Sequence, residues 1–320
     1  MGVNASGLRP KLSTFKKIIA ELKPSVFLIE ETKYKDEGKL KIGGNYIIFE
    51  SVRKSRDGGG GLALGCDKAL HPVWLRDGEE NVEALSVEIS VREMKIRCCV
   101  AYGPQETDLI DRKNSFWSYM DEEVTQASRS GSGLVLHFDG NLWAGPNVIP
   151  GDPRQQNRNG KLFEEFLSRN PQLTVVNSLS LCQGLITRSR LRDGHLEESV
   201  LDFVVVCARV LPHITSMIID EKKKYVLTNF EQVRKGGKAF DSDHFTQIMD
   251  VKLNFLPQKP IRKEIFKSVL LSKSLRTSNT KDFTSCFSDK LPIMKQISNW
   301  RNILKSYFRK SFKKIKILES

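Results

Sequence analysis

The 320-residue sequence has few of the features that build disulfide frameworks, zinc sites or membrane spans. Its 6 cysteines include no Cys-x-x-Cys pair, and most lie among apolar neighbours, as reduced thiols in a protein core do. No apolar run approaches the length of a membrane span, and the N-terminus has no signal-peptide pattern. We therefore expect a soluble, intracellular protein that is not secreted and that uses neither zinc nor disulfides.

Most of the chain also lacks an excess of positive charge, although the formal net charge is +13. Residues 254–320 carry 16 basic and 4 acidic side chains, which leaves 35 basic and 34 acidic side chains in residues 1–253. Charge therefore gives only weak support for nucleic-acid binding by the main part of the chain. We expect one large domain over residues 1–253, followed by a basic linker and an amphipathic helical tail over residues 254–320.

Apolar periodicity predicts many short strands and few helices, without an internal repeat. The glycine run at residues 58–61 lacks the Gly-Lys-Ser/Thr of a phosphate-binding loop, so we interpret it as a hairpin turn. About a dozen strands in hairpins indicate two antiparallel sheets packed face to face with helices outside. Helices are predicted over residues 12–23, 116–127 and 161–169, and the longest strands over residues 26–33, 84–91, 95–102, 134–141, 199–207 and 245–253. A charged turn is predicted after Arg188, and a shorter strand over residues 225–228.

The predicted strand over residues 134–141 is the first sign of a functional site. Its apolar run suits a strand buried on both faces, and it ends in Asp139 and Asn141. On an extended backbone, side chains two residues apart point the same way, so Asp139 and Asn141 could share one ligand. The alternative is an Asx turn that only closes the strand.

Polar residues stand near the ends of four other predicted strands: Asn4, Glu31, Asp202, and Asp243 with His244. Oxygen ligands dominate this set, which suits Mg²⁺ or Mn²⁺ better than zinc. Such an ion polarises a phosphoryl oxygen during hydrolysis. His244 is suited to act as a base or electrostatic partner, and Asp202 is suited to orient it. Each residue alone has a simpler structural explanation, so the prediction depends on their coincidence.

The order of these motifs resembles the endonuclease/exonuclease/phosphatase superfamily. Within it, the chain is most similar to the endonuclease domain of non-LTR (LINE-type) retrotransposons, which resembles apurinic/apyrimidinic endonucleases. The resemblance covers about 245 residues and implies a four-layer α/β sandwich that hydrolyses phosphodiesters with a metal. The motifs that carry it are Asn4-x-x-Gly-Leu-Arg9, Glu30-Glu-Thr-Lys33, Tyr102-x-Pro104, Asp139-x-Asn141, Asn159-Gly160, Ser199-x-x-Asp202 and Ser242-Asp-His244.

The resemblance also implies roles at the metal and around it. Glu31 would be the principal Mg²⁺ ligand, with Asn4 beside it and Asp243 supporting the metal. Asp139 and Asn141 would hold the attacking water or the leaving oxygen.

The remaining implied roles concern the substrate. Tyr102 would contact the scissile phosphate, and Asp202 would orient His244 to stabilise the transition state. Substrate contacts would come from Asn159, Thr187 and Arg188. Whether Asp139 or His244 is the general base stays open.

The sequence departs from the family pattern in three places. Only three residues precede Asn4, so we expect a clipped first strand. Ser6 replaces the acidic residue usual in apurinic-type enzymes, which favours plain nicking over abasic-site repair. The usual Gly-Asp-Phe-Asn appears as Phe138-Asp-Gly-Asn141, so backbone freedom has moved past the aspartate.

We interpret the chain as a Mg²⁺-dependent DNA endonuclease, the nicking module of a retroelement, which leaves a 3′-hydroxyl primer. Its partners would be the DNA backbone and, in the parent element, a downstream reverse transcriptase domain. Its location would be nuclear.

Two alternatives stay open. The first is a phosphatase or phosphodiesterase of the same superfamily that acts on a phosphoinositide, sphingomyelin or another phosphoester. The second is an inactive remnant that binds nucleic acid or a partner through a basic amphipathic helix predicted over residues 297–318. Either enzyme hypothesis requires Glu31, Asp139, Asp202 and His244 to converge on a pocket for one ion and one phosphate.

Overall fold

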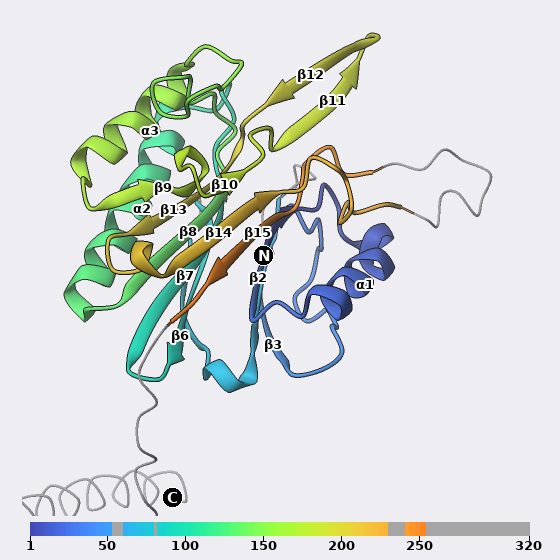
Figure 1. The fold of residues 1–320 in the computed structure, drawn as a ribbon, viewed down its shortest axis with the longest axis vertical. Helices are drawn as coiled ribbons and strands as arrows, with labels where there is room; N and C mark the ends of the chain where they lie inside the picture. The colour runs from blue at the N-terminus through green and yellow to red at the C-terminus, as the bar shows by residue number, and fades with distance from the viewer. Residues whose placement is uncertain (53–59, 80–81, 230–240, 254–320) are drawn as a thin grey trace, which may run out of the picture. The chain divides into compact units, whose positions relative to one another are not determined.

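The computed structural model describes residues 1–52, 60–79, 82–229 and 241–253. These residues form two large β-sheets packed face to face, with helices on the outer faces, and one separate two-stranded sheet (Figure 1). The predicted tail helix over residues 297–318 lies outside the described residues. In the described parts of the chain, no helix is both long and apolar enough to cross a membrane.

The first sheet has seven strands in the order β10-β14-β15-β1-β2-β4-β3. Its pairs are antiparallel except β1 with β2 and β10 with β14. The helix α1 (Leu12–Leu22) connects the parallel pair and packs Phe15, Ile18 and Ile19 into the core, as its apolar spacing predicted. The strands are β1 (Gly2–Asn4), β2 (Val26–Glu30), β3 (Tyr46–Ser51), β4 (Leu62–Asp67), β10 (Cys182–Gln183), β14 (Ile214–Ile219) and β15 (Gln247–Val251).

The second sheet has six strands in the order β5-β6-β7-β8-β13-β9, and only β7 and β8 are parallel. The helices α2 (Ile110–Ser130) and α3 (Arg158–Arg169) cover its outer face (Figure 1). The sheet is therefore mainly antiparallel, as predicted. Its strands are β5 (Val73–Asp77), β6 (Glu83–Val91), β7 (Met94–Tyr102), β8 (Gly133–Asp139), β9 (Leu173–Val175) and β13 (Asp202–Cys207).

All seven residues of β8 are buried, which confirms the prediction of a strand covered on both faces. On one face Phe138 contacts the rings of Trp117 from α2 and Phe163 from α3. Because side chains alternate along a strand, His137 and Asp139 point to the opposite face, toward the first sheet. The aromatic layer thus fixes which residues of β8 face the space between the sheets.

Local details differ from the predictions in two places. The charged turn expected after Arg188 is a two-stranded hairpin of β11 (Arg188–Arg192) and β12 (His195–Ser199), which projects from the body of the domain (Figure 1). Leu191 and Leu196 are exposed on this hairpin, so its apolar residues do not mark a face that packs into a core. The strand predicted over residues 225–228 is reduced to one bridge, between Thr228 and Asp241.

The predicted four-layer sandwich of two mainly antiparallel sheets with outer helices is confirmed. The first strand, β1, spans three residues and lies between β15 and β2. Asn4 is its last residue, beside Glu30 of β2. The strand therefore presents Asn4 at the same edge of the sheet as the end of β2.

Candidate active site

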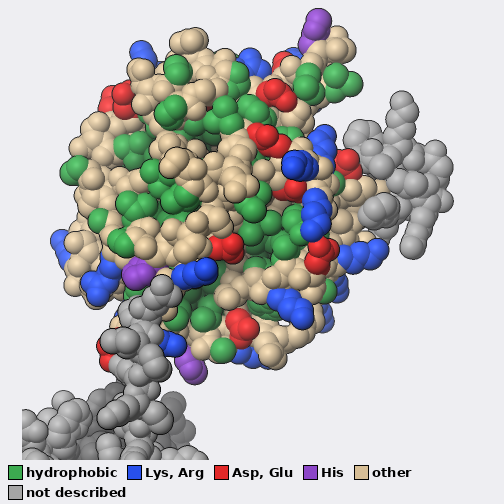
Figure 2. Space-filling view, viewed as in Figure 1, with side chains coloured by type: hydrophobic (Ala, Val, Ile, Leu, Met, Phe, Trp, Pro, Cys, Tyr) green, Lys and Arg blue, Asp and Glu red, His purple; other side chains and the backbone are tan. Residues whose placement is uncertain are grey.

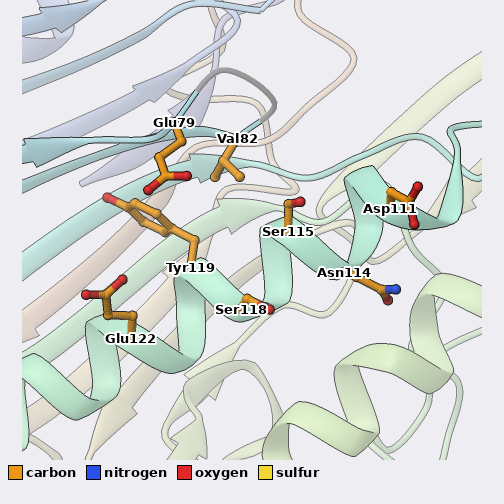
Figure 3. A pocket seen from close by; sticks show the side chains of 8 residues that line it. All are labelled: Glu79, Val82, Asp111, Asn114, Ser115, Ser118, Tyr119 and Glu122. Atoms are coloured by element: carbon orange, nitrogen blue, oxygen red, sulfur yellow. The ribbon is translucent and has the colours of Figure 1, made fainter.

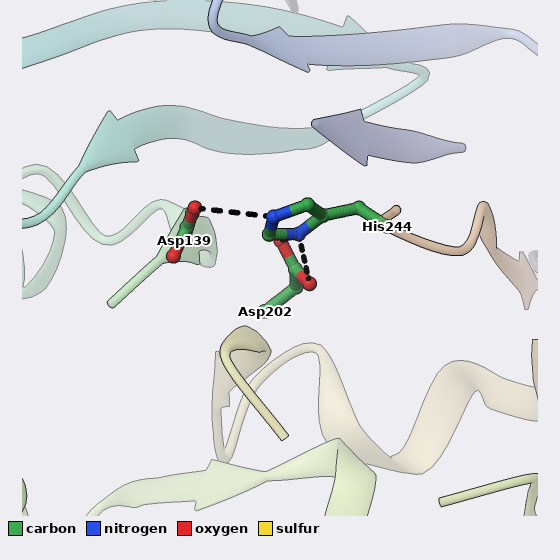
Figure 4. Close-up of side chains that lie close together, drawn as sticks. All are labelled: Asp139, Asp202 and His244. Carbon is green, nitrogen blue, oxygen red and sulfur yellow. Dashed lines mark hydrogen bonds and ion pairs between the residues drawn. The ribbon is translucent and has the colours of Figure 1, made fainter. Parts of the chain in front are cut away.

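Strand ends from both sheets meet at one edge of the sandwich. In the second sheet, Asp139 at the end of β8 lies between Tyr102 of β7 and Asp202 of β13. His244 lies before β15 in the first sheet, and ligand atoms of Asp139, Asp202 and His244 all lie within 4.8 Å of one another (Figure 4). Three residues far apart in the sequence therefore form one buried cluster.

Asn4 connects this cluster to Glu31. Its side-chain Nδ2 donates to Glu31 Oε1 at 3.2 Å and to Asp139 Oδ2 at 2.8 Å. Its Oδ1 accepts from the backbone N–H of Ser6 at 2.9 Å, which fixes the amide orientation. All four residues required to converge, Glu31, Asp139, Asp202 and His244, therefore lie in one connected site.

Glu31 is held in an ionised state at the open side of this site. Its backbone has a φ of +50°, and Lys33 Nζ lies 2.8 Å from its Oε2. Burial acts to raise the pKa of the Glu31 carboxyl, but the bonds from Lys33 and Asn4 outweigh burial and hold that pKa below its ordinary value. An ionised carboxylate is suited to bind a cation.

His244 and Asp202 form a buried ion pair. Nδ1 of His244 lies 2.9 Å and 3.0 Å from the two carboxylate oxygens of Asp202, and Nε2 lies 3.9 Å from Asp139 Oδ2. Burial acts to lower the pKa of His244, but Asp202 and then Asp139 outweigh it and raise that pKa to about 10. The imidazole therefore carries a proton and a positive charge at neutral pH.

The pKa of the buried Asp139 carboxyl lies above its ordinary value. Burial raises its pKa to about 7, and the positive charge of His244 limits the rise. Asn141 N–H donates to Asp139 Oδ1 at 3.0 Å, which is an Asx turn. Asn141 has a φ of +47°, so the prediction that it continues the extended strand and points the same way as Asp139 is wrong. Its Nδ2 instead donates to the carbonyl of Gly103 at 2.8 Å.

Tyr102 lies beside the cluster, with its hydroxyl accepting a 3.0 Å hydrogen bond from Gln105 Nε2. Burial, followed by the charges of Asp139 and Glu31, raises the pKa of the phenol well above its ordinary value. The phenol is therefore neutral and able to donate a hydrogen bond.

Asp243 and Arg188 lie next to His244 and bind each other. Arg188 Nε donates to Asp243 Oδ2 at 2.8 Å, and both side chains are partly exposed. Burial acts to raise the pKa of Asp243, but His244 and Arg188 hold it below its ordinary value. Both side chains remain accessible at the rim of the site.

Thr187 and Asn159 are buried behind the site, where they bind backbone groups. The Thr187 hydroxyl accepts from the N–H groups of Leu201 and Asp202 at 2.8 Å and 3.0 Å. Asn159 Nδ2 donates to the carbonyls of Pro104 and Asn141 at 2.9 Å and 3.2 Å. In these positions the two side chains brace the segments that carry Asp202 and Asn141, and their substrate contacts stay a prediction.

Two functional contacts were missed from the sequence. Gln247 Nε2 donates to the carbonyl of Asp202 at 2.9 Å, and the hydroxyl of Ser242 donates to the carbonyl of Asn4 at 2.9 Å. A polar residue at the start of an otherwise alternating strand was the available signal for Gln247. Both side chains fasten the segment around His244 to the site.

The donor atoms of the site fit a hard divalent cation. Carboxylate oxygens of Glu31 and Asp139 are brought together by one amide, and the available nitrogen donor is His244, whose Nδ1 is engaged by Asp202. Mg²⁺ prefers such oxygen donors together with water.

By contrast, the polar hollow over α2 contains no predicted site residue (Figure 3). Its lining residues are Glu79, Val82, Asp111, Asn114, Ser115, Ser118, Tyr119 and Glu122.

No protein-family model matches the chain, and no curated protein matches it. Solved structures do match. The endonuclease domain of TRAS1, a telomere-specific non-LTR retrotransposon, is 18% identical with a TM-score of 0.55, over 79% of this chain and 98% of that domain. The 3′-5′ exonuclease NExo from Neisseria meningitidis is 14% identical with a TM-score of 0.57, over 78% of this chain and 98% of that chain.

An AP endonuclease from Archaeoglobus fulgidus is 13% identical with a TM-score of 0.53, over 79% of this chain and 98% of that chain. At these identities the likeness concerns the fold. The chain has the fold of the endonuclease/exonuclease/phosphatase superfamily. The resemblance that the motifs predicted, including the likeness to a non-LTR retrotransposon endonuclease domain, is confirmed at that level.

Proposed function

We propose that this protein is a Mg²⁺-dependent phosphodiester hydrolase that nicks DNA. The observation that carries the proposal is the convergence of Glu31, Asp139, Asp202 and His244 at one edge of the sandwich. Structural neighbours that are nucleases support the reaction class. Mn²⁺ has the same preference for oxygen donors and is an alternative ion.

Glu31 would be the principal ligand of the cation, and Asn4 keeps its carboxylate beside that of Asp139, which would hold the attacking water. When bound, the cation polarises a phosphoryl oxygen and offsets the negative charge of the transition state. His244, protonated through Asp202, places positive charge beside the same phosphate. Tyr102, as a neutral phenol, donates to a phosphate oxygen.

Asp139 is the general base in this proposal. A base works best when its pKa lies near the working pH, and burial raises the pKa of Asp139 to about 7. The raised pKa of His244 argues against that role, because a residue that already holds a proton cannot accept one. Asp139 would take the proton of the attacking water, and His244 would remain charged throughout.

The proposed substrate is duplex DNA cut on one strand, in the setting of a retroelement. The likeness to the TRAS1 endonuclease domain supports this choice. A reverse transcriptase domain as the downstream partner and a nuclear location are parts of the same proposal.

A second candidate is removal of a phosphate from a phosphoester other than a DNA phosphodiester. A structure of NExo described as a 3′ phosphatase bound to a product DNA hairpin supports it, at 14% identity and a TM-score of 0.55. Acidic and basic side chains are interspersed on the face of the described domain that Figure 2 shows, so charge does not select a polyanion there. Turnover of a phosphomonoester or an inositol phosphate without nicking would favour this candidate.

A supercoiled-plasmid assay tests the main proposal. Wild type should convert supercoiled to nicked plasmid only with Mg²⁺ or Mn²⁺, and Glu31→Ala or His244→Ala should lower the rate at least 100-fold. Exposed residues provide the matched controls Glu37→Ala and His71→Ala, which should nick at the wild-type rate. Equal nicking rates in wild type and both site variants would contradict the assignment of these residues to a nuclease site.

Thermal melting separates an active site from an inactive remnant. Mg²⁺ should raise the melting temperature of wild type, since a ligand that binds only the folded state stabilises it. Glu31→Ala should show a smaller rise because a metal ligand is gone. Absence of both nicking and a Mg²⁺-dependent rise would support the remnant.

A further inference from the structure

Two polar links join the sheets in successive layers beneath the site surface. The outer link is the hydrogen bond from Asn4 on β1 to Asp139 on β8. The inner link joins Glu30 Oε1 on β2 to His137 Nδ1 on β8. Asn4 and Glu30 are neighbours across the β1–β2 pair, and His137 and Asp139 are two residues apart on one strand. The second link therefore lies directly below the first.

The inner link is fully enclosed by protein. Glu30 is 0% exposed and His137 is 2% exposed. Among the described residues, Glu30 Oε2 and His137 Nε2 have no hydrogen-bond partner, so the polar contact of each side chain there is the one that joins Glu30 to His137. The structure makes special room for the imidazole, because a Cβ on Gly2 would lie 1.9 Å from His137 Nε2. Gly2 thus permits the imidazole to lie against β1.

Stability alone does not account for this pair. Two ionisable groups in a protein interior lose their hydration, and apolar residues of similar volume are often as stable or more stable. A hydrogen bond has a narrow range of length and angle, whereas apolar replacements of similar volume lose unique packing and rigidity before they lose stability. The property that Glu30 and His137 add to the core is therefore a fixed geometry between β2 and β8.

We propose that Glu30 and His137 are a positioning pair for the active site. The pair sets the separation of β2 and β8. Glu31 follows Glu30 in the chain, and Asn4 lies beside Glu30 on β1. Fixing that separation therefore holds Glu31 and Asn4 within reach of Asp139 on the second sheet. It acts through these residues and contacts neither metal nor substrate. The effect on catalysis rests on the proposed hydrolase function, whereas the effect on the Asn4–Asp139 link does not.

The first test replaces the pair by apolar residues, Glu30→Leu with His137→Leu. The melting temperature should stay the same or rise, while kcat for plasmid nicking falls at least tenfold, KM for DNA stays unchanged, and a higher Mg²⁺ concentration is needed for half-maximal rate. Glu30→Gln keeps an acceptor for His137 and should restore most of kcat. Leu28→Met, a change of similar volume one layer deeper on β2, should leave kcat unchanged. A stable double variant with wild-type kcat overturns the proposal.

The second test does not depend on activity. Asn4→Ala is made in wild type and in the double-leucine background, and the loss of melting temperature is compared without metal. Asn4→Ala should cost less in the double-leucine background, because the Asn4–Asp139 link is already weakened there. Equal losses in both backgrounds overturn the positioning role. If wild type neither nicks DNA nor responds to Mg²⁺, the proposed function fails, and this comparison still decides the positioning role.

Discussion

The ion pair between His244 and Asp202 makes the stability of the metal-free protein depend on pH in a defined window. The pair raises the pKa of His244 from 6.5 to about 10, so the folded protein keeps a proton that the unfolded chain releases between these values. Stability from this source is fully present below pH 6.5 and is lost as the pH rises through about 10. At about 1.4 kcal/mol for each tenfold change in proton affinity, the upper bound is about 5 kcal/mol.

Asp139 contributes a slope with the same sign in a lower window. Its pKa is raised by burial from 3.8 to about 7, so the folded protein again holds the proton more tightly than the unfolded chain. That contribution is lost as the pH rises to about 7. Above pH 7 the buried thiols of Cys66, Cys98 and Cys99, whose pKa values are raised by burial, add a loss of the same sign. The contribution of His244 is therefore the difference between wild type and a variant that lacks the ion pair.

The perturbation that tests this reasoning is Asp202→Asn. Without the carboxylate, the pKa of His244 falls, so the unfolding free energy of the variant should decrease less steeply than that of wild type between pH 7 and 10. Wild type should lose about 2 to 5 kcal/mol more than the variant over the same range. Urea denaturation with EDTA at several pH values measures both curves, and Asp193→Asn, at an exposed turn, is the matched control. Parallel curves for wild type and Asp202→Asn above pH 7 would refute the ion-pair reasoning.

Two further predictions follow from buried contacts. Thr187→Val should lower the unfolding free energy by about 1 to 3 kcal/mol, because the N–H groups of Leu201 and Asp202 lose their acceptor. Thr187→Ser keeps the hydroxyl and should retain more of that stability in urea denaturation, so equal losses would contradict the hydrogen-bond explanation. Gly2→Ala should cost about 1 to 3 kcal/mol through overpacking, since the new Cβ would lie 1.9 Å from His137 Nε2. An unchanged melting temperature for Gly2→Ala would show that the imidazole moves freely.

Parts of the fold could be predicted because they depend on local periodicity. The spacing of Phe15, Ile18 and Ile19 placed one face of α1 in the core, and the apolar run before Asp139 predicted the fully buried β8. Such patterns report which face of an element is buried. The projecting hairpin of β11 and β12 was missed because most of its residues are exposed, so periodicity carries no burial signal there.

The site could be predicted as a set of residues but not as a geometry. Residue type and motif order selected Glu31, Asp139, Asp202 and His244, which the structure brings together. The predicted direction of the Asn141 side chain was wrong because its φ of +47° turns the chain, and backbone angles cannot be read from the sequence. The buried position of Thr187 likewise follows from how β13 packs, which is a nonlocal property.

The sequence by itself determined the inventory of this protein: alternating strands, an acidic donor set suited to Mg²⁺, and a basic segment set apart from a near-neutral domain. Only the tertiary structure decided which side chains of the site are charged and which side chains face each other across the two sheets. The pKa values of Asp139 and His244 depend on burial and on charges far away in the chain, as does the pairing of Glu30 with His137. Distances across a sheet interface depend on side chains that are far apart in the chain, and no local pattern encodes them.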